Sequence, residues 1–202
     1  YLIYNFLMCF SNTFNGKKVL ITGHTGFKGS WLALWLKELG ADVHGLSIDV
    51  TSNPSHFNAI SLQDEITDIR GDIRDAKELK TLVDNIKPDF IFHLAAQALV
   101  RPSYEDPLNT ILTNALGSAN LLEALRNTNK NTVVIMITSD KAYDNLEWVW
   151  GYRETDRLGG KDPYSASKGM AEIAIRSYIK SFFSNKNSNI RIGVARAGNV
   201  IG

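Results

Sequence analysis

Short apolar and β-branched runs alternate along the chain with longer stretches in which apolar residues recur every three or four positions. The first pattern is typical of buried parallel strands, and the second of helices that cover a sheet. Strands are predicted over residues 17–23, 42–48, 65–73, 89–96, 132–139 and 190–198. Helices are predicted over residues 30–39, 75–86, 107–127 and 163–183, with loops over 49–64 and 144–162. We therefore expect an α/β fold, a doubly wound parallel sheet of the Rossmann type with about six or seven strands.

Composition narrows the class of protein. The chain has 202 residues, 44% of them hydrophobic and 21% charged, with a formal net charge of +1, as in one ordinary globular domain. Lys and Arg are scattered, so we expect no nucleic-acid partner. The apolar run at the start has about ten residues, too few to span a bilayer, so we expect no membrane partner. The single cysteine, Cys9, excludes a disulfide framework, favours a cytoplasmic protein and, with four unpaired histidines, predicts no metal site.

Three glycines, Gly23, Gly26 and Gly29, stand at every third position between the first strand and the first helix. Glycine permits a tight turn, a close approach of backbone to a pyrophosphate, and close packing of the helix on the strand. The helix N-terminus adds free N–H groups and the positive end of its dipole. The pattern predicts a bound dinucleotide, and the alternative is a glycine-rich turn without a ligand.

The ends of the next two strands are expected to meet the adenosine of that dinucleotide. Ser47 falls nearest the place where an acidic residue normally holds the ribose, and Asp49 follows two residues later. No Lys or Arg occurs between residues 41 and 58, which favours NAD over NADP. Asp72 and Ile73, after the third strand, are expected to meet the adenine, with a solvated turn as the alternative.

Two further groups predict proton-transfer chemistry. Tyr164 and Lys168 stand at i and i+4, on one face of a helix. A neighbouring ammonium and the positive nicotinamide of the cofactor both favour the tyrosinate, so Tyr164 can accept a proton from a substrate hydroxyl. Ser139, Asp140 and Lys141 follow the fifth strand at its carboxyl end, where ligands bind in such sheets. Ser139 can hydrogen-bond the hydroxyl, and Asp140 and Lys141 form a second acid–base pair or, alternatively, a solvated turn.

The ordered motifs GHTGFKG, GDIRD, HLAAQ, TNALGS, TSDKAYD, PYSASK and RAGNVIG resemble the extended short-chain dehydrogenase/reductase family, from about residue 14 to residue 202. The insert WVWGYRE and the SDK triplet are narrower and resemble its nucleotide-sugar 4,6-dehydratases. The resemblance implies NAD as cofactor and a nucleotide sugar as substrate, CDP-glucose in particular. It implies oxidation at C4, loss of water across C5 and C6, and return of the hydride to C6, in deoxysugar biosynthesis for lipopolysaccharide O-antigen.

The resemblance also implies roles for single residues. Ser139 and Tyr164 match the hydroxyl-binding and base positions, Lys168 the ribose-binding one, and Asp140 the acid that protonates the departing C6 hydroxyl. Lys141 stands where related dehydratases carry a glutamate base, and it can take the C5 proton only when neutral, through Lys168, the nicotinamide charge or burial. The implied cofactor contacts are Gly23, Thr25, Gly26, Phe27, Lys28, Gly29, Ser47, Asp72, Ile73, Leu94, Ala95, Ala96, Tyr164 and Lys168. The implied substrate contacts are Gln97, Asn114 and Asn199, with a locally bonded helix asparagine as the alternative for Asn114.

Two positions depart from the family pattern. Many relatives carry an acid where this chain has Ser47, which implies a looser hold on the adenosine ribose. Family members continue past RAGNVIG into a smaller helical substrate domain, so we expect a fragment that binds NAD and lacks turnover. Residues 14–202 are then the NAD-binding domain, and residues 1–13 an N-terminal arm. Within the arm, residues 1–7 are expected not to be native and Met8 to be the start, the alternative being an apolar arm packed on the domain.

The resemblance further implies a homodimer of the full-length protein, through the helix bearing Tyr164 and the helix at 107–127. Two other functions stay open at this point. Another nucleotide-sugar epimerase or reductase of the family needs the tyrosine and lysine but not the pair at 140–141. A non-catalytic NAD-binding module commonly loses the tyrosine, which this chain retains.

Overall fold

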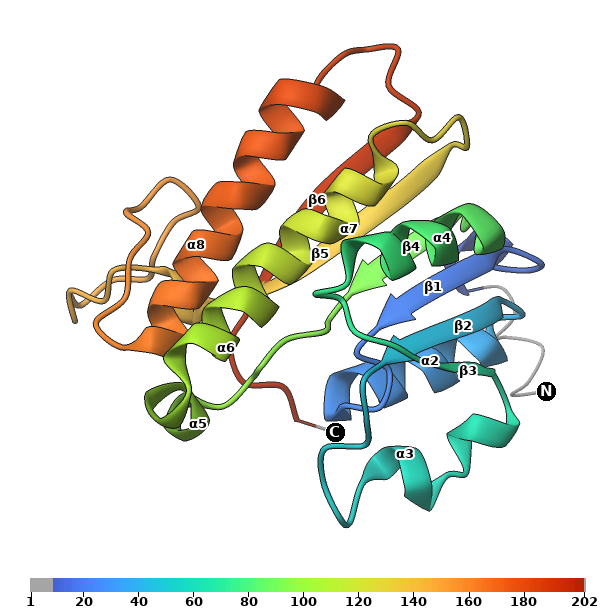
Figure 1. Ribbon diagram of the computed structural model, residues 1–202, viewed down its shortest axis with the longest axis horizontal. Helices are drawn as coiled ribbons and strands as arrows, with labels where there is room; N and C mark the ends of the chain where they lie inside the picture. The colour runs from blue at the N-terminus through green and yellow to red at the C-terminus, as the bar shows by residue number, and fades with distance from the viewer. Residues whose placement is uncertain (1–8, 202) are drawn as a thin grey trace.

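The computed structural model describes residues 9–201, so the expectations for residues 1–7 and Met8 lie outside the described residues. Six parallel strands form one sheet in the order β3-β2-β1-β4-β5-β6 (Figure 1). The strands are β1 (Lys18–Thr22), β2 (Asp42–Ser47), β3 (Thr67–Arg70), β4 (Phe90–His93), β5 (Thr132–Ser139) and β6 (Ile190–Ala197). The order reverses between β1 and β4, which confirms the doubly wound sheet predicted from the sequence.

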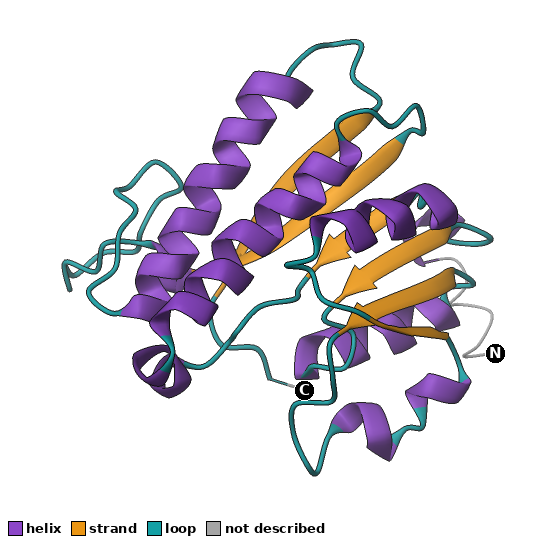
Figure 2. Ribbon diagram, viewed as in Figure 1, coloured by secondary structure: helices purple, strands orange, loops and turns teal. Residues whose placement is uncertain are grey.

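Helices cover both faces of this sheet (Figures 1 and 2). On one face lie α2 (Phe27–Glu38) and α3 (His56–Ala59), and on the other lie α4 (Ala76–Ile86), α7 (Gly117–Leu125) and α8 (Pro163–Tyr178). Two short helices, α5 (Val100–Glu105) and α6 (Pro107–Ile111), precede α7. Among residues 9–201, no helix is both long and apolar enough to cross a membrane.

Local sequence signals explain where the helices begin and end. Asp75 caps α4 by accepting hydrogen bonds from the first-turn N–H groups of Lys77 and Glu78. Asp162 caps α8 in the same way through Ser165, and Pro163 occupies the first helical position. The Asp162 cap and Pro163 fix the start of α8, the helix that carries the predicted catalytic tyrosine.

The structure differs from the predicted elements in detail. The helix predicted over 107–127 is interrupted by a π-helical turn at Leu112–Leu116, and a second π-helical turn, Ile179–Phe183, ends the helix predicted over 163–183. The loop predicted over 49–64 contains α3 and a 3₁₀ turn, and α5 was not predicted. These pieces are too short to produce a readable apolar period, so the sequence gives no signal for them.

The core has two parts, one on each side of the sheet. The central strand β1 is buried on both faces, with Val19, Leu20 and Ile21 fully buried. Val19 and Ile21 pack toward α2 and α3, whereas Leu20 packs in the larger cluster with α4, α7 and α8. This double burial explains the continuous apolar run in the sequence and holds the end of β1 rigidly.

The long segment between β5 and α8 stays irregular, as predicted, but aromatic side chains order it. The Tyr143 and Tyr152 rings stack with centroids 5.0 Å apart, and Trp148 lies 5.3 Å from Tyr152. The Tyr152 hydroxyl accepts a hydrogen bond from the Leu146 N–H at 2.7 Å. The insert that distinguishes this sequence is therefore a stacked aromatic loop anchored beside the end of β5.

Candidate active site

The three glycines of the turn after β1 have different reasons to be glycine. A Cβ on Gly23 would lie 2.7 Å from the backbone nitrogen of Ala95, and one on Gly29 would lie 2.1 Å from the Gly23 carbonyl oxygen. Gly23 also has φ of +79°, in the left-handed region. A Cβ on Gly26 would meet no protein atom closer than 3.4 Å. The fold therefore requires Gly23 and Gly29, whereas a Cβ on Gly26 would make only an ordinary contact with the Gly23 carbonyl oxygen, and no other protein atom fills the space above the turn.

That open space faces the start of α2. Gly26 is the N-cap residue, no side chain caps the helix there, and the first turn contains no acidic residue. The first N–H groups of α2 and its positive dipole end are thus available to an anion. Phe27 is exposed, and Lys28 is half-buried. These features fit the pyrophosphate of a dinucleotide.

The loop after β4 lies directly against this turn. The Ala95 N–H donates to Thr22 Oγ1 at 3.2 Å, and the Thr22 hydroxyl lies 2.7 Å from Nδ1 of the fully buried His93. On its other side, His93 Nε2 lies 3.0 Å from Ser118 Oγ, which donates to the Asn114 carbonyl at 2.7 Å. A buried polar chain therefore joins the predicted cofactor residues Leu94–Ala96 to the π-helical turn.

Asn114 occupies the far end of this chain and is itself buried. Its amide donates to the Gln97 carbonyl at 3.0 Å and to Ser167 Oγ at 2.8 Å, and it accepts from the Gln97 N–H at 2.8 Å. These bonds join different elements, so Asn114 is not the locally bonded helix residue of the alternative interpretation. Gln97 and Asn114 lie together, and their predicted contact with substrate stays a prediction.

Ser47 ends β2 beside the turn, as expected, but its hydroxyl is already engaged. Ser47 Oγ lies 3.0 Å from Nδ1 of His24 and 3.4 Å from the Thr25 N–H. The His24 ring is fully buried, and its Nε2 lies 2.8 Å from the carboxylate of Asp68 on β3. Asp49 is exposed, although its carbonyl accepts a hydrogen bond from Thr25.

The two residues predicted to meet the adenine have different surroundings. The Asp72 carboxylate accepts from the Arg74 backbone at 2.8 Å and from its guanidinium, and this hydrogen bonding lowers the pKa of Asp72. Arg74 also contacts Asn109 on α6. Ile73 is buried, and a Cβ on Gly117 would clash with its side chain at 2.5 Å. The Ile73 side chain therefore fills the core, and the expectation that Asp72 and Ile73 meet the adenine stays a prediction.

Tyr164 and Lys168 lie on one face of α8, as predicted, and the structure shows that both are buried. The Lys168 Nζ lies 5.6 Å from the centre of the Tyr164 ring. Burial raises the pKa of Tyr164, although a hydrogen bond with Ser139 opposes this effect. Burial lowers the pKa of Lys168 to about 8, and the charge of Lys28 acts in the same direction. A neighbouring ammonium alone does not favour the tyrosinate here, because desolvation of the buried phenol is the larger effect.

The Ser139-Asp140-Lys141 group stands at the carboxyl end of β5, next to this pair. Ser139 Oγ accepts from the Lys141 N–H at 3.2 Å and donates to Asp140 Oδ1 at 3.1 Å. Asp140 and Lys141 are exposed. Burial, one of the three effects expected to keep Lys141 neutral, is therefore not seen in this chain. Asp140 also approaches the end of β6, where a Cβ on Gly198 would lie 3.6 Å from its carboxylate, and the adjacent Asn199 is exposed.

A buried ion pair behind this group was not predicted from the sequence. Arg196 on β6 donates to Glu172 on α8 at 2.8 and 3.0 Å, and Thr138 Oγ1 donates to the same carboxylate at 2.5 Å. The Arg196 guanidinium also lies over the Tyr143 ring, 4.7 Å from its centre. This cluster ties β5, β6, α8 and the aromatic loop together. Glu172 lies eight residues after Tyr164 on α8. Helical periodicity was therefore the one sequence signal that placed Glu172 near the face of the helix that carries the tyrosine.

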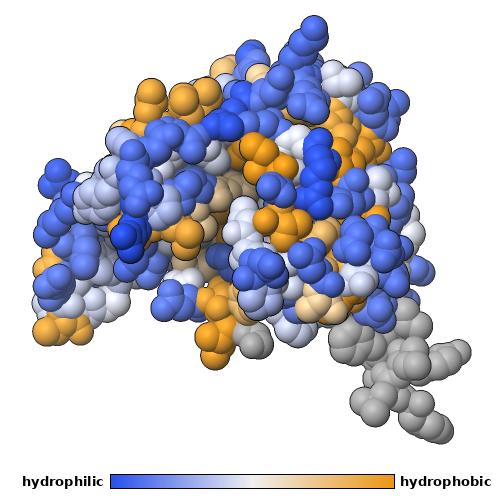
Figure 3. Space-filling model, turned by 60° about the horizontal axis from the view of Figure 1, so that its bottom comes forward, coloured by the Kyte–Doolittle hydropathy of each residue, from blue (hydrophilic) through white to orange (hydrophobic). Residues whose placement is uncertain are grey.

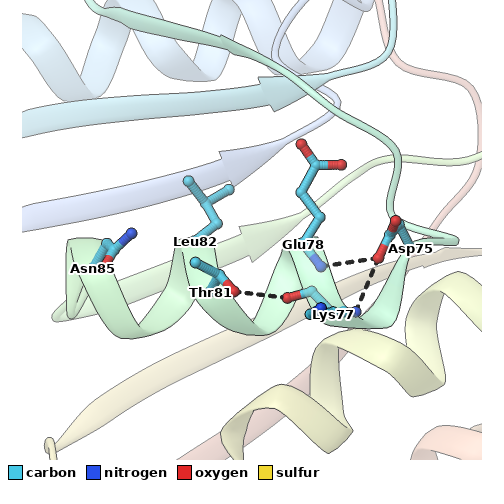
Figure 4. Close-up of a pocket in the computed structure, with 6 residues that line it drawn as sticks. All are labelled: Asp75, Lys77, Glu78, Thr81, Leu82 and Asn85. Carbon is cyan, nitrogen blue, oxygen red and sulfur yellow. Dashed lines mark hydrogen bonds between the residues drawn. The ribbon is translucent and has the colours of Figure 1, made fainter.

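Figure 3 shows a hollow near the middle of the face that comes forward when the bottom of the view in Figure 1 is turned toward the viewer. A second hollow follows the outer face of α4 and is lined by Asp75, Glu78 and other residues of that helix alone (Figure 4). It contains none of the predicted site residues. Within the described part of the chain, no three His, Cys, Asp or Glu side chains gather as a metal site would require.

The reversed strand order, the glycine turn at its switch point and the Tyr164–Lys168 pair define a dinucleotide-binding Rossmann protein. The chain belongs to the extended short-chain dehydrogenase/reductase family, within which the profile of the GDP-mannose 4,6 dehydratase family matches residues 20–191.

Among individual relatives, the chain is 49% identical over 194 residues to CDP-glucose 4,6-dehydratase of Salmonella typhimurium, covering 95% of this chain and 54% of that protein. An epimerase of Methanothermobacter thermautotrophicus superposes with a TM-score of 0.78 at 26% identity, over 96% of this chain and 54% of that one. UDP-glucose 4-epimerase from Brucella ovis, solved in complex with NAD, superposes with a TM-score of 0.73 at 26% identity, over 90% and 51%. The chain spans about half the length of these relatives.

Proposed function

We propose that the protein is an NAD-dependent nucleotide-sugar 4,6-dehydratase that converts CDP-glucose to CDP-4-keto-6-deoxyglucose. The observation that carries the proposal is the Ser139-Asp140-Lys141 group beside the Tyr164–Lys168 pair at the carboxyl end of β5. The Tyr164–Lys168 pair would provide the base for oxidation of an alcohol. The carboxyl group of Asp140 and the amine of Lys141 would provide the acid and the base for elimination of water. The 49% identity to the Salmonella typhimurium enzyme supports CDP-glucose as the substrate.

The residues around the turn fit NAD. The open space at Gly26 and the uncapped start of α2 suit the pyrophosphate, and Ser47 with Asp72 stands where the adenosine would lie. Lys168 would hold the nicotinamide ribose beside Tyr164. When bound, NAD would supply a temporary store for the hydride between sugar C4 and C6, so it would be regenerated in each turnover.

In the first step, the chain's own groups handle the proton of the sugar C4 hydroxyl. Ser139 hydrogen-bonds this hydroxyl, and Tyr164 accepts its proton as the C4 carbonyl forms. Burial keeps the free Tyr164 phenol protonated, so the positive nicotinamide ring is needed to favour the tyrosinate. We expect oxidation to depend on the cofactor for this electrostatic reason as well as for its chemistry.

In the second step, the new C4 carbonyl acidifies the proton on C5. Lys141, when neutral, takes this proton, and Asp140 protonates the C6 hydroxyl, which leaves as water. Both side chains are exposed in this chain, next to the exposed Asn199 at the end of β6. A proton is restored to C5 from Lys141 or from solvent, which completes the part of the reaction that the chain's own groups would carry out.

The relatives are about twice as long as this chain, and we propose that residues 14–202 are the NAD-binding domain of a protein with a second, substrate-binding domain. We further propose a cytoplasmic homodimer active in O-antigen deoxysugar synthesis. Several apolar side chains exposed on α6, the π-helical turn and α8 support the dimer: Leu108, Leu112, Leu116, Met170 and Ile173. Size-exclusion chromatography with light scattering tests it, and a monomer at micromolar concentration contradicts it.

The function is tested with the whole protein, CDP-glucose or dTDP-glucose, and NAD in deuterated water, with the product read by NMR. We expect a 4-keto-6-deoxy sugar that carries deuterium at C5, formed from the CDP sugar in preference. A C4 epimer would instead support the epimerase alternative, and binding of NAD without any turnover would support the non-catalytic module. The Tyr164→Phe protein serves as the inactive control.

A further inference from the structure

A polar chain that is exposed at Arg70 and buried at His24 and Ser47 runs beside the predicted adenosine site, and the proposed reaction makes no use of it. It begins at Arg70, whose guanidinium donates to Asp68 Oδ2 at 2.7 Å. Asp68 Oδ1 lies 2.8 Å from His24 Nε2, and His24 Nδ1 lies 3.0 Å from Ser47 Oγ. The His24 ring packs on Gly45, where a Cβ would lie 2.3 Å from the ring. The chain therefore ends at the ribose-side hydroxyl of Ser47.

The hydrogens in this chain can be assigned from chemistry. Asp68 is paired with an arginine, which always carries its protons, so its carboxylate acts as an acceptor. His24 is neutral at pH 7, because burial lowers its pKa below the ordinary value although its hydrogen bond to the Asp68 carboxylate acts in the opposite direction. A neutral imidazole has one N–H, and facing a carboxylate it must be the one on Nε2. The Nδ1 atom is then a bare acceptor, and the Ser47 hydroxyl has to donate to it.

The orientation of the Ser47 hydroxyl decides what it offers to a ligand. With its hydrogen directed at His24, Ser47 Oγ has only lone pairs left, and the distant Thr25 N–H uses at most one of them. A ribose 2′-hydroxyl can donate to the remaining lone pair. A 2′-phosphate has only acceptor oxygens at neutral pH and would face another acceptor. The oxygen of Ser47 thus behaves toward the ribose as the carboxylate of an acidic residue would.

We propose that His24 is a positioning residue that fixes Ser47 as a hydrogen-bond acceptor and thereby selects NAD over NADP. The inference rests on the proposed function for the identity of the ligand. Asp68 contributes twice, because it fixes the His24 tautomer and also holds Arg70, which is paired in register with Ser47. Arg70 is the one basic side chain in register with Ser47 on β3, and it lies over the Phe57 ring at 5.4 Å. Its engagement by Asp68 removes an attraction for a 2′-phosphate.

The tautomer is measured without any cofactor. Long-range ¹H–¹⁵N spectra of the ¹⁵N-histidine-labelled protein are recorded, and the His24 signals are assigned by their loss in His24→Phe. We expect the hydrogen of His24 on Nε2 and an unprotonated Nδ1 across neutral pH. A hydrogen on Nδ1 contradicts the proposal, whatever the cofactor affinities are.

The selectivity is measured as the ratio of NADP to NAD dissociation constants by calorimetry. His24→Phe and Ser47→Ala should each lower this ratio about three- to tenfold, the effect of one net hydrogen bond. His24→Phe in the Ser47→Ala background should lower it no further, because the histidine acts only through the serine. His44→Phe, on the same strand as Ser47, is the matched control and should leave the ratio unchanged.

If His24→Phe fails to fold, Asp68→Asn gives the same information, because an asparagine amide can donate to Nε2 and reverse the tautomer. The ratio should again fall, and Nδ1 should carry the hydrogen. An unchanged ratio in the folded variants, or additive effects of the His24 and Ser47 substitutions, overturns this inference alone. A wild-type protein that binds neither dinucleotide overturns the proposed function instead.

Discussion

The ammonium of Lys168 lies 5.6 Å from the centre of the Tyr164 ring, one turn further along α8, and both side chains are buried. Burial raises the pKa of the tyrosine and lowers that of the lysine to about 8. Each group therefore pays a desolvation cost for its charged form. Tyr164 therefore stays protonated at neutral pH unless a further positive charge beside it favours the tyrosinate.

Replacement of Tyr164 by Phe removes the proton acceptor and keeps the ring. We expect kcat to fall about 10³-fold, within the usual range for loss of a general base. The dissociation constant for NAD should change less than about threefold, because the ring packing is retained. Steady-state kinetics and calorimetry check the two expectations, and a variant that kept a tenth of the wild-type kcat would remove Tyr164 from the role of base.

Replacement of Lys168 by Met should stabilise the fold while it abolishes turnover. The folded-state pKa of Lys168, about 8, lies below the ordinary value of 10.5, so the unfolded state binds its proton more tightly. Below pH 8 both states are protonated, and the full burial cost applies, on the order of 3 kcal/mol. Between pH 8 and 10.5 this cost is progressively relieved, so wild-type stability rises with pH relative to that of the variant.

Urea denaturation of both proteins at pH 7, 9 and 10.5 tests the Lys168 prediction. The variant should be more stable by about 3 kcal/mol at pH 7, and the difference should shrink to near zero at the highest pH. A difference that is constant with pH would mean that the effect comes from packing of the methionine rather than from the buried charge.

The glycine turn offers a pair of substitutions that separate folding from binding. Gly29→Ala places a Cβ 2.1 Å from the Gly23 carbonyl oxygen and should destabilise the fold by several kcal/mol. Gly26→Ala meets nothing closer than 3.4 Å, so its melting temperature should change by no more than a few degrees. Its NAD affinity should nevertheless fall at least about tenfold, because the methyl group occupies the approach to the pyrophosphate. Normal NAD affinity in Gly26→Ala would argue against the phosphate turn.

For the Glu172–Arg196 pair, we expect the losses of unfolding free energy in two single variants to be strongly non-additive in the double variant. Only 6% of the Glu172 side chain and 17% of the Arg196 side chain are exposed, so either partner alone is a poorly solvated charge. Arg196→Met and Glu172→Met should each cost about 3–5 kcal/mol of unfolding free energy, and the double variant should recover much of this loss. Chemical denaturation of the four proteins measures the coupling, and purely additive losses would show that the pair is solvated like a surface salt bridge.

Lys141→Met separates the two halves of the proposed reaction. The variant should still oxidise C4, because Tyr164 and Ser139 are unchanged, but the C5 proton should no longer be lost. Transient formation of NADH reports the first half, and exchange of C5 hydrogen with deuterated solvent reports the second. Undiminished C5 exchange in this variant would assign the base to another group.

A feature of this fold could be predicted from the sequence when the residues that form it lie close together in the chain. The phosphate turn and the strands were predictable because glycine spacing and apolar runs are short-range signals. The tyrosine and lysine were predictable because both stand on one helix. The neighbours of Ser47 were not, because His24, Asp68 and Arg70 come from three segments that only the sheet brings together.

Two details near the predicted adenosine site follow from the structure alone. Ile73 stands next to Asp72 in sequence, but the Asp72 side chain reaches solvent whereas the Ile73 side chain enters the core against Gly117. No Lys or Arg occurs between residues 41 and 58, but the sheet pairs Arg70 of β3 in register with Ser47. The roles assigned to the site residues and the boundaries of the domains stay predictions.

The chain of hydrogen bonds through His93 has a single direction. Ser118 gives its hydrogen to the Asn114 carbonyl, so it must accept from His93 Nε2, and Nδ1 must accept from Thr22. The hydroxyl groups of Thr22 and Ser118 can therefore reverse their hydrogen bonds only together. Burial lowers the pKa of His93 to about 3, so the order also survives acidification far below neutral. The loop beside the glycine turn and the helix beside the tyrosine are thereby kept in one fixed alignment from neutral pH down to about the pKa of His93.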